Sequence, residues 1–281
     1  MTTAKLYNIQ GTEIKSIALP KQFDEPVDEN LIKRAVLVLQ QNKRQKYGAL
    51  KTAGMRSSAN LSRRRKDYRG GYGRGMSRVP RKVMWRRGTQ FSYEGAFVSG
   101  TKGGRKAHPS KPEKNFEVKI NKKERRKAIR SAISATLSSD LVSVRHKLPK
   151  VFPLITEAKI ETFNKTKQLK DLLIKLGLES ELKRISKKTI RAGKGTKRNR
   201  KYKTKKGPLI ITAKVGPLEK ASKNLPGIEF SPIDKINAEI LAPGTTPGRL
   251  VIWSESALER LEKEKLFTNS PVYLKKEKAN E

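Results

Sequence analysis

The chain has 281 residues, a formal net charge of +39, two histidines and no cysteine. A chain of this length forms one large domain or two small ones. The excess of Lys and Arg indicates a polyanionic partner, nucleic acid above all, whereas the lack of cysteine excludes disulfides, thiolate metal sites and a thiol nucleophile. No apolar run in the sequence approaches the ~18 residues that a membrane span requires, and the first residues lack the apolar core of a signal peptide. We therefore expect a soluble, intracellular protein.

The N-terminal segment has the patterns of ordinary secondary structure. Alternation of apolar and polar residues over 4–19, interrupted at Gly11, predicts two short strands or a hairpin. An acidic connector follows, in which Asp28 is placed to cap a helix predicted from about Glu29 to Lys43. A catalytic carboxylate pair is the alternative for this acidic cluster, but no polar residue of a pocket accompanies it.

The stretch from Lys43 to Lys106 differs in composition from its surroundings. It carries nineteen Lys or Arg against two acidic residues, together with eleven glycines and aromatic residues that follow no apolar period. Such a segment buries too little apolar surface to offset its ordering entropy, so we expect an irregular extension that is mobile alone and folds on RNA. Arginine, glycine and aromatic residues suit folded RNA because they bind phosphates, permit close backbone approach and stack on unpaired bases. A flexible, solvated linker is the alternative.

Two short motifs in this extension, and one histidine just after it, resemble ligand sites but lack a feature that such a site requires. Arg69–Gly75 is rich in glycine, but its last glycine falls one position short of the dinucleotide-binding spacing and no strand precedes it. Gly95–Lys102 ends in Gly-Thr-Lys instead of the Gly-Lys-Ser/Thr of a phosphate-binding loop. His108 has no second metal ligand at a useful spacing, which favours a histidine that stacks on or hydrogen-bonds to a base. We therefore predict no nucleotide site, no cofactor and no metal.

The remaining segments indicate an α/β core. A helix predicted from Asn121 to about residue 138 has an apolar stripe, with six cations and one acid within residues 122–130. Strands are predicted at 151–155, 208–212, 227–230 and 249–253, and helical segments at 166–176, 179–185, 218–223, 231–238 and from Ser254 or Ser256 to about 265. This alternation predicts an α/β fold with a mostly parallel sheet flanked by helices, a Rossmann-like layering without a nucleotide site.

The order of these segments predicts the domain organisation. Both halves of the core flank the extension, so we expect a single globular α/β domain over 1–281 with an RNA-binding arm inserted at 44–110. Residues 186–207 are then a basic surface loop and residues 268–281 a charged tail. Residues 183–206 carry thirteen Lys or Arg and no acid, which suits phosphate contact. A merely solvated loop or a targeting signal is the alternative.

Six short stretches, spread over nearly the whole chain, form a set that is specific for one protein family. No single stretch would identify a family alone. They are Gly73–Arg81, Gly103–Pro109, Asn121–Ala132, Ile190–Gly195, Lys223–Gly227 and Asn237–Gly244. Together they closely resemble large-subunit ribosomal protein L-four in its archaeal and eukaryotic form. The chain lacks the long C-terminal extension of eukaryotic members, which favours an archaeal source.

The resemblance implies a globular domain on the outer face of the large ribosomal subunit and an extension threaded into ribosomal RNA. It also implies that the extension helps to form the constriction of the nascent-peptide exit tunnel, near another extended ribosomal protein. Carried over by position, the tunnel-lining candidates are Arg81, Lys82, Val83, Met84, Trp85, Arg86, Arg87, Gly88 and Thr89. The run Met84–Arg87 departs from the glycine-rich pattern of the eukaryotic form.

The expected partners are large-subunit ribosomal RNA, neighbouring large-subunit ribosomal proteins and the nascent peptide near the arm tip, in the cytoplasmic ribosome. No membrane and no small-molecule substrate is expected. The candidate RNA-binding residues are cations and stacking side chains of three segments: Arg56, Arg63, Arg64, Arg65, Arg69, Tyr72, Arg74, Arg78, Arg81, Lys82, Trp85, Arg86, Arg87, Arg105, Lys106 and His108; Lys122, Lys123, Arg125, Arg126 and Arg130; and Arg191, Lys194, Lys197, Arg198, Arg200, Lys201 and Tyr202.

Two other functions fit parts of this pattern. A chromatin-like compactor of nucleic acid would bind duplex DNA and RNA about equally, whereas a structural RNA-binding protein prefers folded ribosomal RNA. An RNA-modifying enzyme requires a reactive site, and the sequence has no cysteine, no paired histidines, no phosphate loop and no suitably spaced carboxylates. We therefore predict a structural protein and not an enzyme.

Overall fold

The structure, a computed structural model, describes residues 2–269, so most of the predicted charged tail lies outside the described residues. The chain divides into two compact units. One comprises Met1–Asn42 and Val118–Glu281 and is called the core here, and the other, Lys43–Glu117, is called the arm unit.

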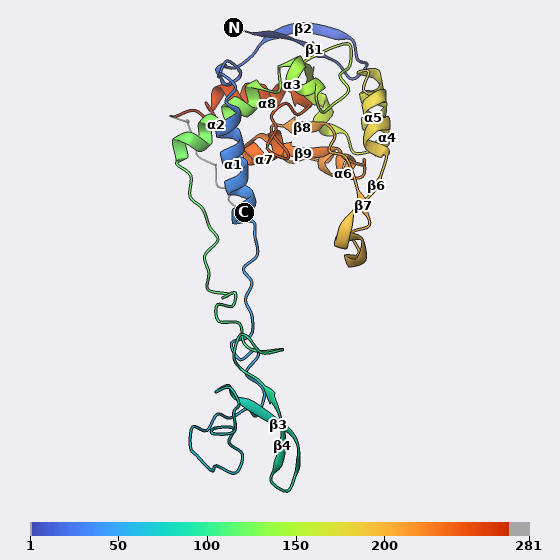
Figure 1. Cartoon of the computed structure of the whole chain (residues 1–281). Helices are drawn as coiled ribbons and strands as arrows, with labels where there is room; N and C mark the ends of the chain where they lie inside the picture. Colours follow the sequence, from blue (N-terminus) through green and yellow to red (C-terminus); the bar gives the residue numbers. More distant parts are fainter. Residues whose placement is uncertain (1, 270–281) are drawn as a thin grey trace, which may run out of the picture. The chain divides into compact units, whose positions relative to one another are not determined.

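A six-stranded sheet forms the centre of the core (Figure 1). Its spatial order is β2 (Glu13–Ala18), β1 (Thr3–Tyr7), β5 (Leu154–Thr156), β10 (Val251–Ser254), β8 (Leu209–Thr212) and β9 (Glu229–Pro232). Strand β2 pairs antiparallel with β1 as a hairpin, and every other neighbouring pair is parallel. The predicted mostly parallel sheet is confirmed.

Helices cover both faces of this sheet, as expected. One face is covered by α1 (Glu29–Asn42), α2 (Lys122–Ser134), α7 (Ala238–Leu241) and α8 (Glu255–Lys263), with two short 3-10 turns, Lys21–Phe23 and Ile233–Lys235. The other is covered by α3 (Ser139–Ser143), α4 (Thr166–Lys175), α5 (Glu179–Ser186), α6 (Leu218–Lys223) and the 3-10 turn Ala158–Thr162. Successive strand residues point to opposite faces, so Val251 and Trp253 enter one apolar cluster and Ile252 the other.

The helix termini agree with the sequence in part. Asp28 caps α1 as predicted, because its Oδ1 accepts from the Leu31 N–H at 3.0 Å. Helix α2 ends at Ser134, four residues before the predicted end. The tighter turn that follows, in which the Thr136 N–H donates to the Ile133 carbonyl at 3.0 Å, accounts for the difference. The predicted cap Asn121 stands at the N-terminus of α2 without a side-chain hydrogen bond to the helix.

A carboxylate of the chain itself occupies the edge of the sheet where open α/β folds usually bind ligands. Glu161 Oε1 accepts from the Ser254 hydroxyl at 2.7 Å, from the Ala213 N–H at 3.0 Å and from the Ser256 hydroxyl. Ala213 follows β8, Ser254 ends β10 and Ser256 lies in the first turn of α8. The side chain of Glu161 therefore joins these three elements. It also supplies the negative charge that the N-terminus of a helix attracts.

The predicted irregular extension contains regular structure over residues 81–95. Strands β3 (Arg81–Arg87) and β4 (Gln90–Gly95) form an antiparallel hairpin in the arm unit. Arg87 pairs with Gln90, which leaves Gly88 and Thr89 as a two-residue turn, and Gly88 has the positive φ of +57° that such a turn requires. The Lys82 ammonium lies 3.1 Å from the Glu94 carboxylate opposite it.

The outgoing and returning stretches of the arm unit also approach closely outside this hairpin. The Ala49 N–H donates to the Ser110 carbonyl at 3.0 Å. A Cβ atom on the neighbouring Gly48 would lie only 2.3 Å from Pro112 Cδ, so only glycine permits this approach.

A buried ionic cluster joins the segment after α3 to α5. His146 Nδ1 lies 2.7 Å from Glu181 Oε1, the Lys147 N–H donates to Glu181 Oε2 at 3.0 Å, and Arg184 donates to both oxygens at 2.6 and 2.7 Å. Burial opposes ionisation of Glu181, but donation from Arg184, His146 and the Lys147 amide outweighs it and lowers the pKa of Glu181 to about 2. Burial lowers the pKa of His146, against the opposing effect of Glu181.

Replacing Trp253 by Ala is expected to lower the free energy of unfolding by about 3–5 kcal/mol, because it removes a large buried side chain. Trp253 is 1% exposed and meets Phe23 edge-on with ring centroids 5.2 Å apart. Trp85→Ala is the matched control, since Trp85 is 57% exposed and its loss opens no core cavity. Urea unfolding measures both variants; similar losses would contradict the assignment of Trp253 to the core.

Acid is expected to destabilise the core through the buried cluster. Because the pKa of Glu181 falls from 4.5 to about 2 on folding, its stabilisation is complete above pH 4.5 and is lost as the pH falls towards 2. The linked free energy is roughly 3 kcal/mol. His146 adds to this loss of stability. Because its pKa is also lowered on folding, protons favour the unfolded chain as the pH falls below 6.5.

This pH dependence is measured by urea unfolding at several pH values and constant ionic strength. Glu181→Gln should be less stable near neutral pH and should lack the part of the profile between pH 4.5 and 2. Glu179→Gln on the same helix is the control, because its exposed carboxylate pairs only with the exposed Lys183. Parallel profiles for wild type and Glu181→Gln would contradict the role of the cluster.

Candidate nucleic-acid interface

Most of the predicted RNA-binding cations of the arm unit lie on its surface. The exposed candidates are Arg56, Arg63, Arg64, Arg65, Arg69, Arg74, Arg78, Trp85, Arg86, Arg87, Arg105, Lys106 and His108, whereas Tyr72, Arg81 and Lys82 are half-buried. The arm unit contains four acidic residues, so these exposed cations largely face one another and solvent. Such a surface attracts a polyanion.

The β3–β4 hairpin carries an aromatic cluster on one side and free apolar side chains at its exposed positions. Phe91 contacts Tyr68 edge-on at 5.2 Å and Tyr93 at 5.7 Å between ring centroids. Arg86 extends this cluster, since it donates to the Tyr68 hydroxyl at 3.0 Å. Trp85, by contrast, makes no ring contact within residues 2–269 and remains free to stack.

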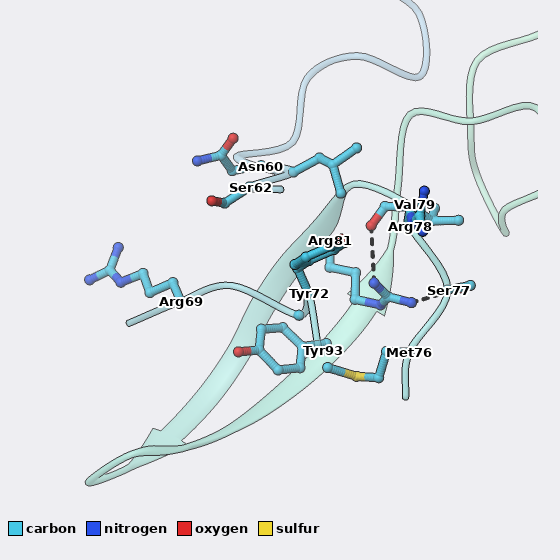
Figure 2. A pocket seen from close by; sticks show the side chains of 12 residues that line it. Asn60, Ser62, Arg69, Tyr72, Met76, Ser77, Arg78, Val79, Arg81 and Tyr93 are labelled. Atoms are coloured by element: carbon cyan, nitrogen blue, oxygen red, sulfur yellow. Dashed lines mark hydrogen bonds between the residues drawn. The ribbon is translucent and has the colours of Figure 1, made fainter. Parts of the chain in front are cut away.

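Arg81 connects the hairpin to the segment around Asn60 through an isolated antiparallel bridge. Its backbone exchanges two hydrogen bonds of 3.1 Å with Asn60. Figure 2 shows its guanidinium bonded to the Ser77 hydroxyl at 2.8 Å and to the Val79 carbonyl at 3.2 Å. Arg81 was predicted as an RNA and tunnel contact, but in the arm unit its side chain organises the loop before β3.

A small cavity lies beside this arginine. It has a volume of about 20 Å³ and is lined by Tyr72, Met76 and Tyr93 among others (Figure 2). This volume suffices for one water molecule, and the buried Tyr93 hydroxyl has no partner within the described chain. The cavity is therefore too small for a nucleobase.

Sequence reasoning missed a cluster at the base of the arm unit. The rings of Tyr47 and Phe116 stack at 5.8 Å with an angle of 11° between them. The Arg44 guanidinium lies 4.4 Å from the centroid of Phe116 and 5.4 Å from that of Tyr47. The two aromatic residues are far apart in sequence, and no local pattern links them.

The cations of α2 differ in their availability. Lys122, Lys123 and Arg125 are exposed, whereas Arg126 donates to the Asn269 carbonyl at 3.0 Å. Arg130 is engaged within the core: it donates to Glu25 at 2.8 Å and to the Phe267 carbonyl at 2.8 Å. We therefore leave Arg130 out of the interface proposed below.

The second basic stretch projects from the core as a small hairpin, residues 187–206, called the basic hairpin here (Figure 1). It contains β6 (Thr189–Ile190), β7 (Tyr202–Lys203) and a 3-10 turn, Gly193–Arg198. Lys201 and Lys188 lie 5.6 and 6.0 Å from the ring of Tyr202. The predicted contacts here are all exposed: Arg191, Lys194, Lys197, Arg198, Arg200, Lys201 and Tyr202.

The described residues contain no grouping of three or more His, Cys, Asp or Glu that could hold a metal ion. Among residues 2–269, no helix combines the length and apolar character needed to cross a membrane. The chemistry available on these surfaces is charge pairing with phosphates, hydrogen bonding and stacking.

Comparison with known proteins identifies the family. A model of the ribosomal protein L4/L1 family matches residues 17–264. The large ribosomal subunit protein uL4 of Nanoarchaeum equitans is 47% identical and covers 93% of this chain and 98% of its own length. The proteins of that name from Methanococcoides burtonii and Halobacterium salinarum are 42% and 40% identical over 93% and 90% of this chain, and 98% and 96% of their own. The predicted resemblance is thus confirmed, and the chain belongs to the ribosomal protein L4/L1 family in its archaeal type.

Proposed function

We propose that this protein is a structural, non-enzymatic component of the large ribosomal subunit in the cytoplasm, and that it binds and organises large-subunit ribosomal RNA. Its relatives are named as large ribosomal subunit proteins. The observation that carries the RNA-binding part is the pair of exposed cationic surfaces, the arm unit and the basic hairpin, each with an exposed aromatic residue among its cations.

Phosphate contacts supply most of the affinity in this proposal. Each cation that meets a phosphate releases condensed counterions, so binding weakens as salt is raised. Contacts of this kind position the protein without specifying a sequence. The exposed α2 cations Lys122, Lys123 and Arg125 are further candidates for phosphate contact on the core.

Stacking supplies the preference for folded RNA over duplex DNA. Unpaired bases in RNA loops and bulges stack on aromatic rings, whereas a regular duplex offers no such bases. Trp85 on β3 and Tyr202 on β7 are both exposed and suit this role. A compactor that ignores shape would have no use for exposed aromatic residues among its cations.

The tip of the β3–β4 hairpin is the part proposed to reach the exit tunnel and the nascent peptide. Val83, Met84, Trp85, Arg86, Arg87, Gly88 and Thr89 are all exposed in the arm unit. Arg81 and Lys82 are half-buried and paired within the arm, so we propose that they support the tip and leave the contacts to residues 83–89.

The proposal is tested by sedimenting lysate of the source cell through sucrose gradients of increasing salt and probing for this protein. We expect it to remain with the large subunit at high salt, because an arm embedded in folded RNA is shielded from competing ions. Release at moderate salt would reduce the arm to a peripheral electrostatic binder. Co-migration with chromosomal DNA would favour the compactor.

We also propose that the core is one folding domain and the arm an insertion within it. Replacing residues 44–110 by a short Gly/Ser linker should leave cooperative urea unfolding of the core unchanged within about 1 kcal/mol, since loop length affects stability weakly. The same variant should lose its place in the large subunit in the gradient. An unfolded core after the replacement would show that the arm is part of the domain.

A further inference from the structure

The basic hairpin is too small to hold its own orientation. Each of its strands has two residues, and its side chains are exposed on every element. An isolated two-stranded hairpin is marginal even when it is longer. The eleven Lys and Arg of residues 187–206 would also repel one another, so the orientation of the hairpin must be set by the residues where it leaves and re-enters the core.

Two arginine side chains hold the point where the hairpin re-enters the core. Arg184, just before the hairpin, donates through Nη2 to the carbonyl of Lys206 at its end, at 2.7 Å. The next carbonyl, that of Gly207, accepts from Nε and Nη2 of Arg249 at 3.1 and 3.0 Å. The Arg249 side chain is fully buried and also donates to Glu229 at 2.7 Å.

Glu181 determines where Arg184 points. Its carboxylate is fully buried and receives Arg184 in a two-pronged contact, at 2.6 and 2.7 Å. His146 and the Lys147 N–H occupy the remaining acceptor positions of the two oxygens. This arrangement leaves Arg184 Nη2 aimed at the Lys206 carbonyl.

We propose that Glu181 is a positioning residue for RNA binding: it holds Arg184, and through Arg184 it presents the basic hairpin to RNA in one orientation. This inference rests on the proposed RNA binding by the hairpin. A fixed hairpin loses less conformational freedom when it binds, so its phosphate contacts contribute more affinity. Glu181 itself touches no RNA in this arrangement.

The test uses the full chain and large-subunit ribosomal RNA, with hydroxyl-radical footprinting and filter binding at several salt concentrations. Glu181→Gln keeps the shape of the side chain but not its charge, and Arg184→Lys keeps the charge but not the two-pronged contact. Both should lower the affinity about tenfold, flatten the salt dependence and lose the hairpin's share of the footprint, while the footprint of the arm persists. Glu179→Gln, exposed on the same helix, is the matched control.

A double-mutant cycle separates positioning from simple stabilisation of the core. Lys197, Arg198, Arg200 and Lys201 are changed to Gln with and without Glu181→Gln. If Glu181 acts through the hairpin, its replacement causes no further loss of affinity once these cations are gone. Additive losses of affinity would overturn the proposal, and so would an intact hairpin footprint in a folded Glu181→Gln protein. If Glu181→Gln does not fold, the same measurements on Arg184→Lys decide.

The proposed function fails in a different way from this inference. If neutralising the four hairpin cations in an otherwise wild-type chain leaves RNA affinity and footprint unchanged, the hairpin is not an RNA contact, and the RNA-binding proposal is wrong for this surface. If that change weakens binding but the Glu181 and Arg184 variants bind like wild type, only the positioning role is wrong.

Discussion

Repulsion among like charges is the constraint on which this structure depends. The chain has 65 Lys and Arg against 26 Asp and Glu, and only four of those acids lie in the arm unit. The core therefore holds nearly all the negative charge, and several of its carboxylates tie elements together. Glu25 joins the acidic connector to α2, Glu229 joins β9 to Arg249, and Glu181 joins α5 to His146 in the segment after α3. The unpaired positive charge is left on surfaces where a polyanion can neutralise it.

The half-buried Glu161 shows how the edge of an α/β sheet can be closed by a side chain of the chain itself. In many open α/β sheets the carboxyl edge binds an anionic ligand at the N-terminus of a helix. Here Glu161 provides the negative charge at that edge and accepts hydrogen bonds from Ala213, which follows β8, and from residues of β10 and α8. The α/β layers therefore form a rigid scaffold, and the surfaces proposed for RNA binding lie on the segments that project from it.

The sequence predicted the parts of the fold whose signals are local. Helix α1 with its Asp28 cap, the β1–β2 hairpin and the parallel strands followed from periodicity and capping residues. The β3–β4 hairpin was missed because Val83, Met84 and Trp85 follow one another without an intervening polar residue and so break the alternation typical of a strand. The pair Gly88-Thr89 was nevertheless a usable turn signal. The Glu181–His146 contact and the Tyr47–Phe116 stack join residues 35 or more positions apart, so no local sequence pattern predicts them.

The arm unit and the basic hairpin both bury little apolar surface to offset the loss of chain entropy on ordering, and they are ordered by different contacts. The arm unit orders itself partly through its own contacts: the Arg44–Tyr47–Phe116 cluster, the close approach at Gly48 and the β3–β4 pairing. The basic hairpin has few internal contacts and relies on arginines anchored in the core. Burial lowers the pKa of Arg249 to about 10, which still leaves the guanidinium charged at neutral pH, so the anchor is maintained there. A cationic segment can therefore be presented in a fixed orientation without a hydrophobic core of its own, provided that arginines paired with carboxylates of the core bind the carbonyls where the segment re-enters it.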